Sequence, residues 1–530
     1  MPWLQPARGG SFGHPRRRRR NPVVFLVPLA LLALVIAAAV LYVLHRRHVD
    51  DQRASARRYA QAWAGRDARA MWNALDPASR ATYPLERFLR SVRAADRTAT
   101  VTAVQLGKPS GPHGAVVDQP VAVRTRLFGT LRGTVALKVD GGSGVVWSPA
   151  NRLPGLQPGE RIRRRVTHSP HRAQALTRDG RPMASDPLLS PFLKGLEQRY
   201  GSRLAGRPGA ELFFGRRLIA RVPAQNGRPI RSTLDRRLQL VAQQALGAQL
   251  GGVAVVRPRD GSVLALAGIA DSAPQPPGST FKIVTLSGVL ANGIAKASSG
   301  FPAQTSATLS GVRLANANNE SCGGSLAASF ANSCNSVFAP LGAKLGAKRL
   351  VAQAEAFGFN EAPRVPVAKP STIPAASALR DDLAVGSSAI GQDKDLATPL
   401  QMASIGATIG EHGIRAVPRV VTSDPVLRRR AVSAKVAAQV RAMMIGVVQS
   451  GTGTAGAIPG VQVAGKTGTA ELRFTGNGSS DPKNTDAWFV AFAPASHPRA
   501  AVAVMLVGAG FGGASAAPIA RQVLAAALGR

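Results

Sequence analysis

The first clear pattern along the chain is an apolar run, residues 23–44, that holds no charged side chain. At about 1.5 Å of rise per residue, a helix of this length measures roughly 33 Å and can cross a bilayer. Five arginines at 16–20 precede the run, and only Arg46 and Arg47 follow it closely. This bias predicts a cytoplasmic basic tail over 1–22, one transmembrane helix over 23–44 and an extracytoplasmic remainder. A cleaved signal peptide is the alternative, but the run is long for one and no clear cleavage site follows it.

The next pattern, over residues 49–155, changes from helical to strand periodicity. Helical spacing of apolar residues covers 52–64, 68–75 and 85–94, and strand-like runs cover 99–105, 114–126 and 133–139. This order predicts a small α+β domain. Residues 156–230 are polar, rich in glycine and short of long apolar runs, so we expect a small pedestal domain there.

Residues 231–530 have longer apolar segments. A helix is expected over 234–250, and two strands over 252–256 and 262–266 flank a Pro-Arg-Asp-Gly turn. An alanine-rich helical stretch follows, and the segment ends with three strands and a helix, expected over 462–472, 488–492, 500–507 and 516–528. Strands at both ends with helices between them predict an antiparallel sheet flanked by helices. The whole chain is therefore expected to be an α+β multidomain protein.

Composition narrows the classes of function. The 530 residues include 67 Lys+Arg and 28 Asp+Glu, which gives a net charge of +39, and 45% are hydrophobic, which excludes wholesale disorder. Aromatic residues make up only 5%, which argues against base-stacking platforms. A basic exported protein is expected to meet anionic lipid or wall polymers and no nucleic acid, although an arginine-rich bias alone explains the charge equally well. Cys322 and Cys334 are the two cysteines, and either a disulfide or two free buried thiols fits their spacing.

Three short motifs contain the candidate chemistry. The first runs from Ser279 to Lys282 and opens an apolar, helix-compatible run after a Pro-Pro-Gly break. Positions i and i+3 share a helix face, so the Lys282 amine is expected beside the Ser279 hydroxyl, where a desolvated lysine can act as a base. A second S-x-x-K match, residues 480–483, lies in a polar loop where this argument does not apply.

The second and third motifs supply polar partners. In Ser333-Cys334-Asn335, the hydroxyl can relay a proton and the amide can bind a substrate amide. In Lys466-Thr467-Gly468-Thr469, Lys466 and Thr467 make a carboxylate-binding pair, and Gly468 is expected to leave room for a substrate backbone at a strand edge. The backbone N–H groups of Ser279 and Thr469 are candidates for an oxyanion hole. Taken singly, each motif also fits a helix cap, a polar turn or a strand end.

The order and contexts of these motifs resemble those of the penicillin-binding transpeptidases, which are serine acyl-enzymes. Other stretches similar to class B members of that family are 233–235, 389–392, 398–403 and 486–491. Residues 147–149 with 153–156 are similar to the end of an NTF2-like domain, and residues 177–180 resemble a degraded pedestal motif. The resemblance implies an NTF2-like domain over 49–155, a pedestal or dimerisation-like domain over 156–230 and a transpeptidase domain related to serine β-lactamases over 231–530.

The resemblance also implies an activity. Ser279 would attack the D-Ala–D-Ala bond of a peptidoglycan stem peptide and would be acylated by β-lactams, with Lys282 as base and Ser333 and Asn335 as relay and substrate binder. Lys466, Thr467, Gly468 and Thr469 would complete the site. No metal or cofactor is implied, and a wall-synthesis polymerase complex is a potential partner. The alternatives are a non-catalytic penicillin-binding scaffold or sensor, and a D,D-carboxypeptidase or β-lactamase. A β-lactamase is disfavoured because no Glu-x-x-Leu-Asn follows Ser333 in the expected region.

Overall fold

A computed structural model describes residues 23–167, 170–472 and 481–530. The predicted basic tail and the Ser480 end of the second S-x-x-K match lie outside these residues. The chain forms two compact units, one made of residues up to 170 together with 207–225, the other of 171–206 with 226–530. The expected pedestal segment, 156–230, is thus shared between the two units, and its status as a domain of its own stays a prediction.

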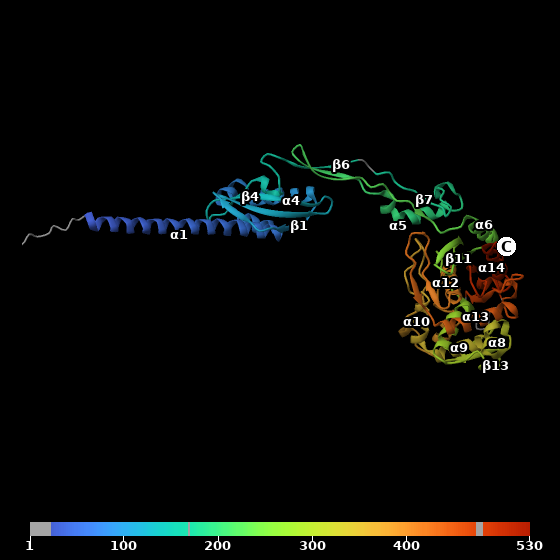
Figure 1. Ribbon diagram of the computed structural model, residues 1–530. Helices are drawn as coiled ribbons and strands as arrows, with labels where there is room; N and C mark the ends of the chain where they lie inside the picture. Colours follow the sequence, from blue (N-terminus) through green and yellow to red (C-terminus); the bar gives the residue numbers. More distant parts are fainter. Residues whose placement is uncertain (1–22, 168–169, 473–480) are drawn as a thin grey trace, which may run out of the picture. The chain divides into compact units, whose positions relative to one another are not determined.

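The first unit begins with α1 (Val23–Ala64), one continuous helix of 42 residues (Figure 1). We expected separate helices over 23–44 and 52–64, but no Gly or Pro lies between these segments to break the helix. Large apolar side chains from Leu31 to Leu44 are exposed, whereas Tyr59 and Trp63 near its end are buried. By length and composition, α1 is the one helix among the described residues that could cross a membrane.

The rest of the first unit packs helices on an antiparallel sheet. Strands β1 (Val101–Leu106), β3 (Val116–Thr125), β4 (Gly129–Val139) and β5 (Val145–Val146) form the sheet in that order, and β2 (Ser110–His113) pairs with β3. The helices are α1, α2 (Ala68–Asn73), α3 (Pro77–Thr82) and α4 (Leu85–Ala99). Thr100 adopts φ +57° and ends α4, so Ala99 belongs to the helix and not to the strand we expected.

A second, smaller sheet completes this unit. It contains β6 (Ile162–Val166), β8 (Ala210–Phe214) and β9 (Arg217–Val222) in antiparallel order. Inside the unit, the Trp147 indole donates a 3.0 Å hydrogen bond to the Tyr59 hydroxyl. This bond joins the end of α1 to the segment that follows the first sheet.

The second unit is built on a five-stranded antiparallel sheet, as predicted. Its strands lie in the order β12 (Ser262–Gly268), β11 (Gly251–Arg257), β21 (Ala500–Leu506), β20 (Thr485–Ala493) and β19 (Ala464–Glu471). Helices α6 (Arg236–Leu246) and α14 (Ala516–Leu528) contact one face, and α12 (Pro399–Gly410) contacts the other. Alternate residues of β20 therefore enter two different cores, which is why the strand reads as a continuous apolar run. Strand β19, which contains the third motif, lies at the sheet edge.

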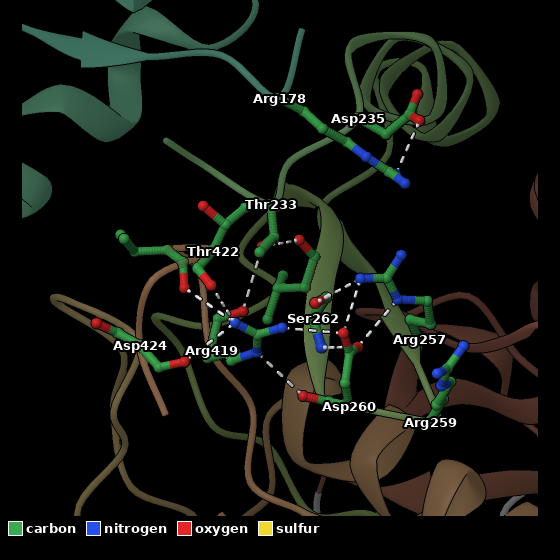
Figure 2. A network of polar contacts seen from close by, with 12 residues as sticks. Arg178, Thr233, Asp235, Arg257, Arg259, Asp260, Ser262, Arg419, Thr422 and Asp424 are labelled. Atoms are coloured by element: carbon green, nitrogen blue, oxygen red, sulfur yellow. Dashed lines mark hydrogen bonds and ion pairs between the residues drawn. The ribbon is translucent and has the colours of Figure 1, made fainter. Parts of the chain in front are cut away.

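A charged network anchors the turn between β11 and β12 (Figure 2). The Asp260 carboxylate accepts hydrogen bonds of 2.8 and 2.9 Å from Arg257 and of 2.9 Å from Arg419. Arg419 also donates to the carbonyls of Val421, Thr422 and Asp424. A guanidinium has five donors in a fixed fork, so the single side chain of Arg419 can bond both the turn and the segment 421–424.

The same figure shows an ion pair between the stretches 177–180 and 233–235, both of which resemble segments of the known family. Arg178, within the degraded pedestal motif, lies 3.3 Å from the carboxylate of Asp235, which caps α6. Both residues belong to the second unit.

Candidate active site

Ser279 and Lys282 lie in a short helical segment that approaches β19. Ser279 lies in the 3₁₀ turn η4 (Gly278–Phe281), and Lys282 begins α7 (Lys282–Ala291). The two face each other as predicted, with the Lys282 Nζ atom 2.9 Å from the Ser279 Oγ atom. Gly278 has φ +51°, and a Cβ there would lie 2.9 Å from the Thr469 carbonyl oxygen. A glycine is therefore needed to bring Ser279 this close to the third motif.

The second motif lies in a tight turn between helices α8 (Leu326–Ala331) and α9 (Asn335–Leu345). Ser333 adopts φ +62°, in the left-handed region that is uncommon for residues other than glycine. Cys334 forms a disulfide with Cys322, with Cα atoms 5.5 Å apart, so the structure selects the bonded alternative over two free thiols. The bond joins the motif to strand β16 (Cys322–Ser325).

The Lys282 amine lies at the centre of the first two motifs. Its Nζ atom is 2.7 Å from the Ser333 carbonyl oxygen and 2.7 Å from Asn335 Oδ1, and both of these atoms can only accept a hydrogen bond. The Asn335 Nδ2 atom donates to the Ala315 carbonyl at 2.8 Å, which fixes the orientation of the amide. A neutral amine has only two N–H groups, and both donate hydrogen bonds to these two carbonyl oxygens. Its lone pair is left for the Ser279 hydroxyl.

The pKa values of the two motif lysines explain why the Lys282 amine can be neutral. Burial, and then the charge of Lys466, holds the pKa of Lys282 well below its usual range. Burial alone lowers the pKa of Lys466 to about 7. Both side chains are fully buried, so neither ammonium is stabilised by water.

The third motif reaches the second through Lys466. Its Nζ atom donates to Ser333 Oγ at 2.8 Å and to the Thr467 carbonyl at 3.1 Å. Gly468 has a packing role in addition to the one we predicted. A Cβ there would lie 2.9 Å from the Pro277 carbonyl oxygen, Thr280 Cγ2 and Trp488 Cβ. The missing side chain thus makes room for η4 and β20, not only for a substrate.

The three motifs line one cleft of about 370 Å³. The predicted residues that line it are Ser279, Ser333, Asn335, Thr467, Gly468 and Thr469, while Lys282 and Lys466 lie buried behind them. The cleft is also lined by residues that we did not predict for the site, among them Gln392, Thr452 and Phe511. Gln392 belongs to the stretch 389–392 that is similar to class B members, and this signal could have pointed to it. Thr452 and Phe511 lie outside the named stretches, and their proximity to the site follows only from the packing of distant segments.

Comparison with known proteins gives a matching family model. Residues 251–525 match the penicillin binding protein transpeptidase domain. The Mycolicibacterium smegmatis protein called peptidoglycan D,D-transpeptidase PbpA is 33% identical over 491 residues, which cover 77% of this chain and 97% of that protein. The Mycobacterium tuberculosis protein of the same name is 34% identical over 405 residues, 64% of this chain and 78% of that protein.

Solved structures give the same picture. The D,D-transpeptidase domain of a peptidoglycan glycosyltransferase from Eggerthella lenta is 28% identical and has a TM-score of 0.58, with 68% of this chain and 99% of that chain covered. Penicillin-binding protein A of M. tuberculosis, in its penicillin G acyl-enzyme complex, is 28% identical and has a TM-score of 0.53, with 68% of this chain and all of that chain covered.

Proposed function

The chain belongs to the penicillin-binding protein transpeptidase family, and we propose that it is a peptidoglycan D,D-transpeptidase whose acyl-enzyme forms at Ser279. One observation above all supports this activity. Both N–H groups of a neutral Lys282 amine donate hydrogen bonds to carbonyl oxygens. The Ser279 hydroxyl, 2.9 Å away, then faces the remaining lone pair of the amine. A serine needs such a base to become a nucleophile.

In the proposed acylation, Ser279 Oγ attacks the carbonyl carbon of the D-Ala–D-Ala bond and its proton passes to Lys282. The oxyanion is stabilised by the backbone N–H groups of Ser279 and Thr469. The C–N bond then breaks, and the departing D-Ala amine takes a proton relayed through Ser333, which Lys466 holds at 2.8 Å. Thr467, backed by the charge of Lys466, binds the D-Ala carboxylate. An amine of a second stem peptide then attacks the ester, Ser279 regains its proton, and a cross-link is formed. β-Lactams acylate the same serine.

Further features of the chain support a place at the membrane surface. We propose that α1 anchors the protein with its N-terminus in the cytoplasm, because the five arginines at 16–20 outnumber the two, Arg46 and Arg47, that closely follow the apolar run. The helices and antiparallel sheet of the first unit support an NTF2-like fold. We propose that this unit is a spacer that lifts the catalytic unit from the bilayer, and that a polymerase of wall synthesis is a partner.

The activity is tested by labelling the full-length protein, in detergent, with fluorescent penicillin. Wild type and Ser298→Ala, an exposed serine outside the motifs, should be labelled, and Ser279→Ala should not. The label should persist for an hour after excess unlabelled drug is added. Loss within minutes would instead indicate a hydrolase, and no labelling of a folded wild type would indicate a scaffold.

A further inference from the structure

The hydroxyl of Thr452 makes an unusually close contact with the third motif. Its Oγ1 atom lies 2.5 Å from Thr467 Oγ1, and either atom can be the donor. The same Thr452 hydroxyl lies 3.3 Å from the Ala331 carbonyl oxygen, which can only accept. Thr452 is exposed and lines the cleft, whereas Thr467 is buried.

Each hydroxyl has one proton, so two arrangements exist. In the first, Thr452 donates to Ala331 and Thr467 donates to Thr452, which leaves no Thr467 proton for the cleft. In the second, Thr452 donates to Thr467 and Thr467 directs its own proton into the cleft. An ionised carboxylate only accepts hydrogen bonds, so it binds well to the second arrangement alone.

The backbone around Thr452 holds this hydroxyl in place. The Thr452 N–H donates to the same Ala331 carbonyl at 3.1 Å, at the end of α8 and two residues before Ser333. A Cβ at Gly451 would overlap the Ala331 carbonyl, and one at Gly513 would overlap the Thr452 carbonyl. Two glycines therefore permit the close packing that joins the second motif, Thr452 and the third motif.

We propose that Thr452 is a positioning residue of the carboxylate-binding end of the cleft, and that its hydroxyl turns from Ala331 to Thr467 when the terminal carboxylate of a donor peptide arrives. The Thr467 hydroxyl then donates its proton to a hydrogen bond with the carboxylate. The hydrogen bond that Thr467 accepts from Thr452 polarises its O–H group and makes it a stronger donor. Thr452 thus makes the site selective for donors and β-lactams that have a carboxylate. This inference rests on the proposed function.

The test uses two thioester stem-peptide mimics, with mercaptoacetate and mercaptoacetamide leaving groups, on the full-length protein. Thr452→Val should lower kcat/KM for the carboxylate thioester about 10-fold, mainly through KM, the size expected for one hydrogen bond. The value for the neutral amide thioester should change less than 2-fold, so the preference of the enzyme for the carboxylate falls. Thr452→Ser keeps the hydroxyl and should restore that preference.

Thr454 offers a matched control two residues away. It is also exposed, and its hydroxyl makes no hydrogen bond to Thr467 in the described structure, so Thr454→Val should keep the wild-type preference. An equal loss on both thioesters, or an unchanged preference in Thr452→Val, would overturn the role of Thr452. Failure of wild type to acylate at all would instead contradict the proposed function, so the two failures are distinct.

Discussion

The Nζ atom of Lys466 lies 2.8 Å from the Oγ atom of Ser333, although 133 positions separate the two residues. Ser333 also lies 3.4 Å from Lys282 Nζ, so its hydroxyl lies between two buried lysines. The charge of Lys466 therefore acts on Lys282 and on Ser333 together.

Removal of the Lys466 charge should change the pH dependence of acylation. Acylation needs neutral Lys282, so the rate rises with pH through the pKa of Lys282. Burial lowers that pKa first, and the Lys466 charge lowers it further. Lys466 is charged below its own pKa of about 7, so Lys466→Met should raise the pKa of Lys282 and move the rise to higher pH. The acylation rate of fluorescent penicillin, measured from pH 5 to 10, gives the answer.

The maximal rate of Lys466→Met should also fall, because Ser333 loses a donor. Lys344→Met is the control, since it removes one positive charge at an exposed position on α9. An unshifted rise in Lys466→Met, with folding intact, would contradict the electrostatic coupling of the two lysines.

Substitution of Gly468 should damage packing as well as activity. The added methyl group of Gly468→Ala would lie 2.9 Å from three neighbouring atoms, and overpacking of this kind costs about 1–3 kcal/mol. The displacement of η4 should also slow acylation of Ser279. Denaturation in urea and the labelling rate measure the two effects.

A second glycine supplies the comparison. At Gly446, within helix α13 (Ala434–Gln449), a Cβ would have no atom within 4 Å. Gly446→Ala should leave labelling unchanged and raise stability by up to about 1 kcal/mol, because alanine favours the helix. If both alanine variants are equally stable, the close approach at Gly468 is not a constraint.

The Asp260 network should make stability depend on pH. Burial raises the pKa of this carboxyl, but hydrogen bonds from Arg257 and Ser262 outweigh burial, so the pKa lies well below its usual range. A carboxyl whose folded-state pKa is depressed stabilises the protein fully above its unfolded pKa, about 3.9; this contribution declines below that pH and is lost as the pH falls through the folded-state pKa. Asp260→Asn should therefore cost about 2 kcal/mol at pH 7, since two arginines lose a charged acceptor, and less at pH 3.

Chemical denaturation at the two pH values tests this expectation. Glu197→Gln, which removes the acceptor of the exposed pair with Arg172, is the control and should have little effect at either pH. A loss in Asp260→Asn of equal size at both pH values would speak against a charge-dependent role.

Loss of the disulfide should lower both stability and the acylation rate. A bridge that spans 12 positions stabilises by about 3 kcal/mol through loop entropy, so Cys322→Ser with Cys334→Ser should lose about that much. Ser333 precedes the bridge and should be less well held, so acylation should slow. Full acylation by the double variant would show that the bridge acts on stability alone.

The sequence by itself determined the features that depend on local spacing. The apolar run 23–44 is long enough to cross a bilayer as a helix, and the predicted strands have alternating or continuous apolar residues. Ser279 and Lys282 share one helix face because they lie three positions apart. The antiparallel sheet was predicted in this way, whereas the meeting of the three motifs was implied by the family resemblance, and the structure confirms both.

Only the tertiary structure decided which distant atoms meet. Four features join segments that lie apart in the chain. They are the hydrogen bonds from the Lys282 amine to two carbonyl oxygens, the Cys322–Cys334 bond, the packing of Gly468 and the contact of Thr452 with Thr467. We also did not predict that α1 continues across 45–51. The residues there are mostly polar and show no apolar periodicity, although none of them breaks a helix. Periodicity describes a residue and its near neighbours, whereas these contacts depend on how whole elements pack, so no local pattern could specify them.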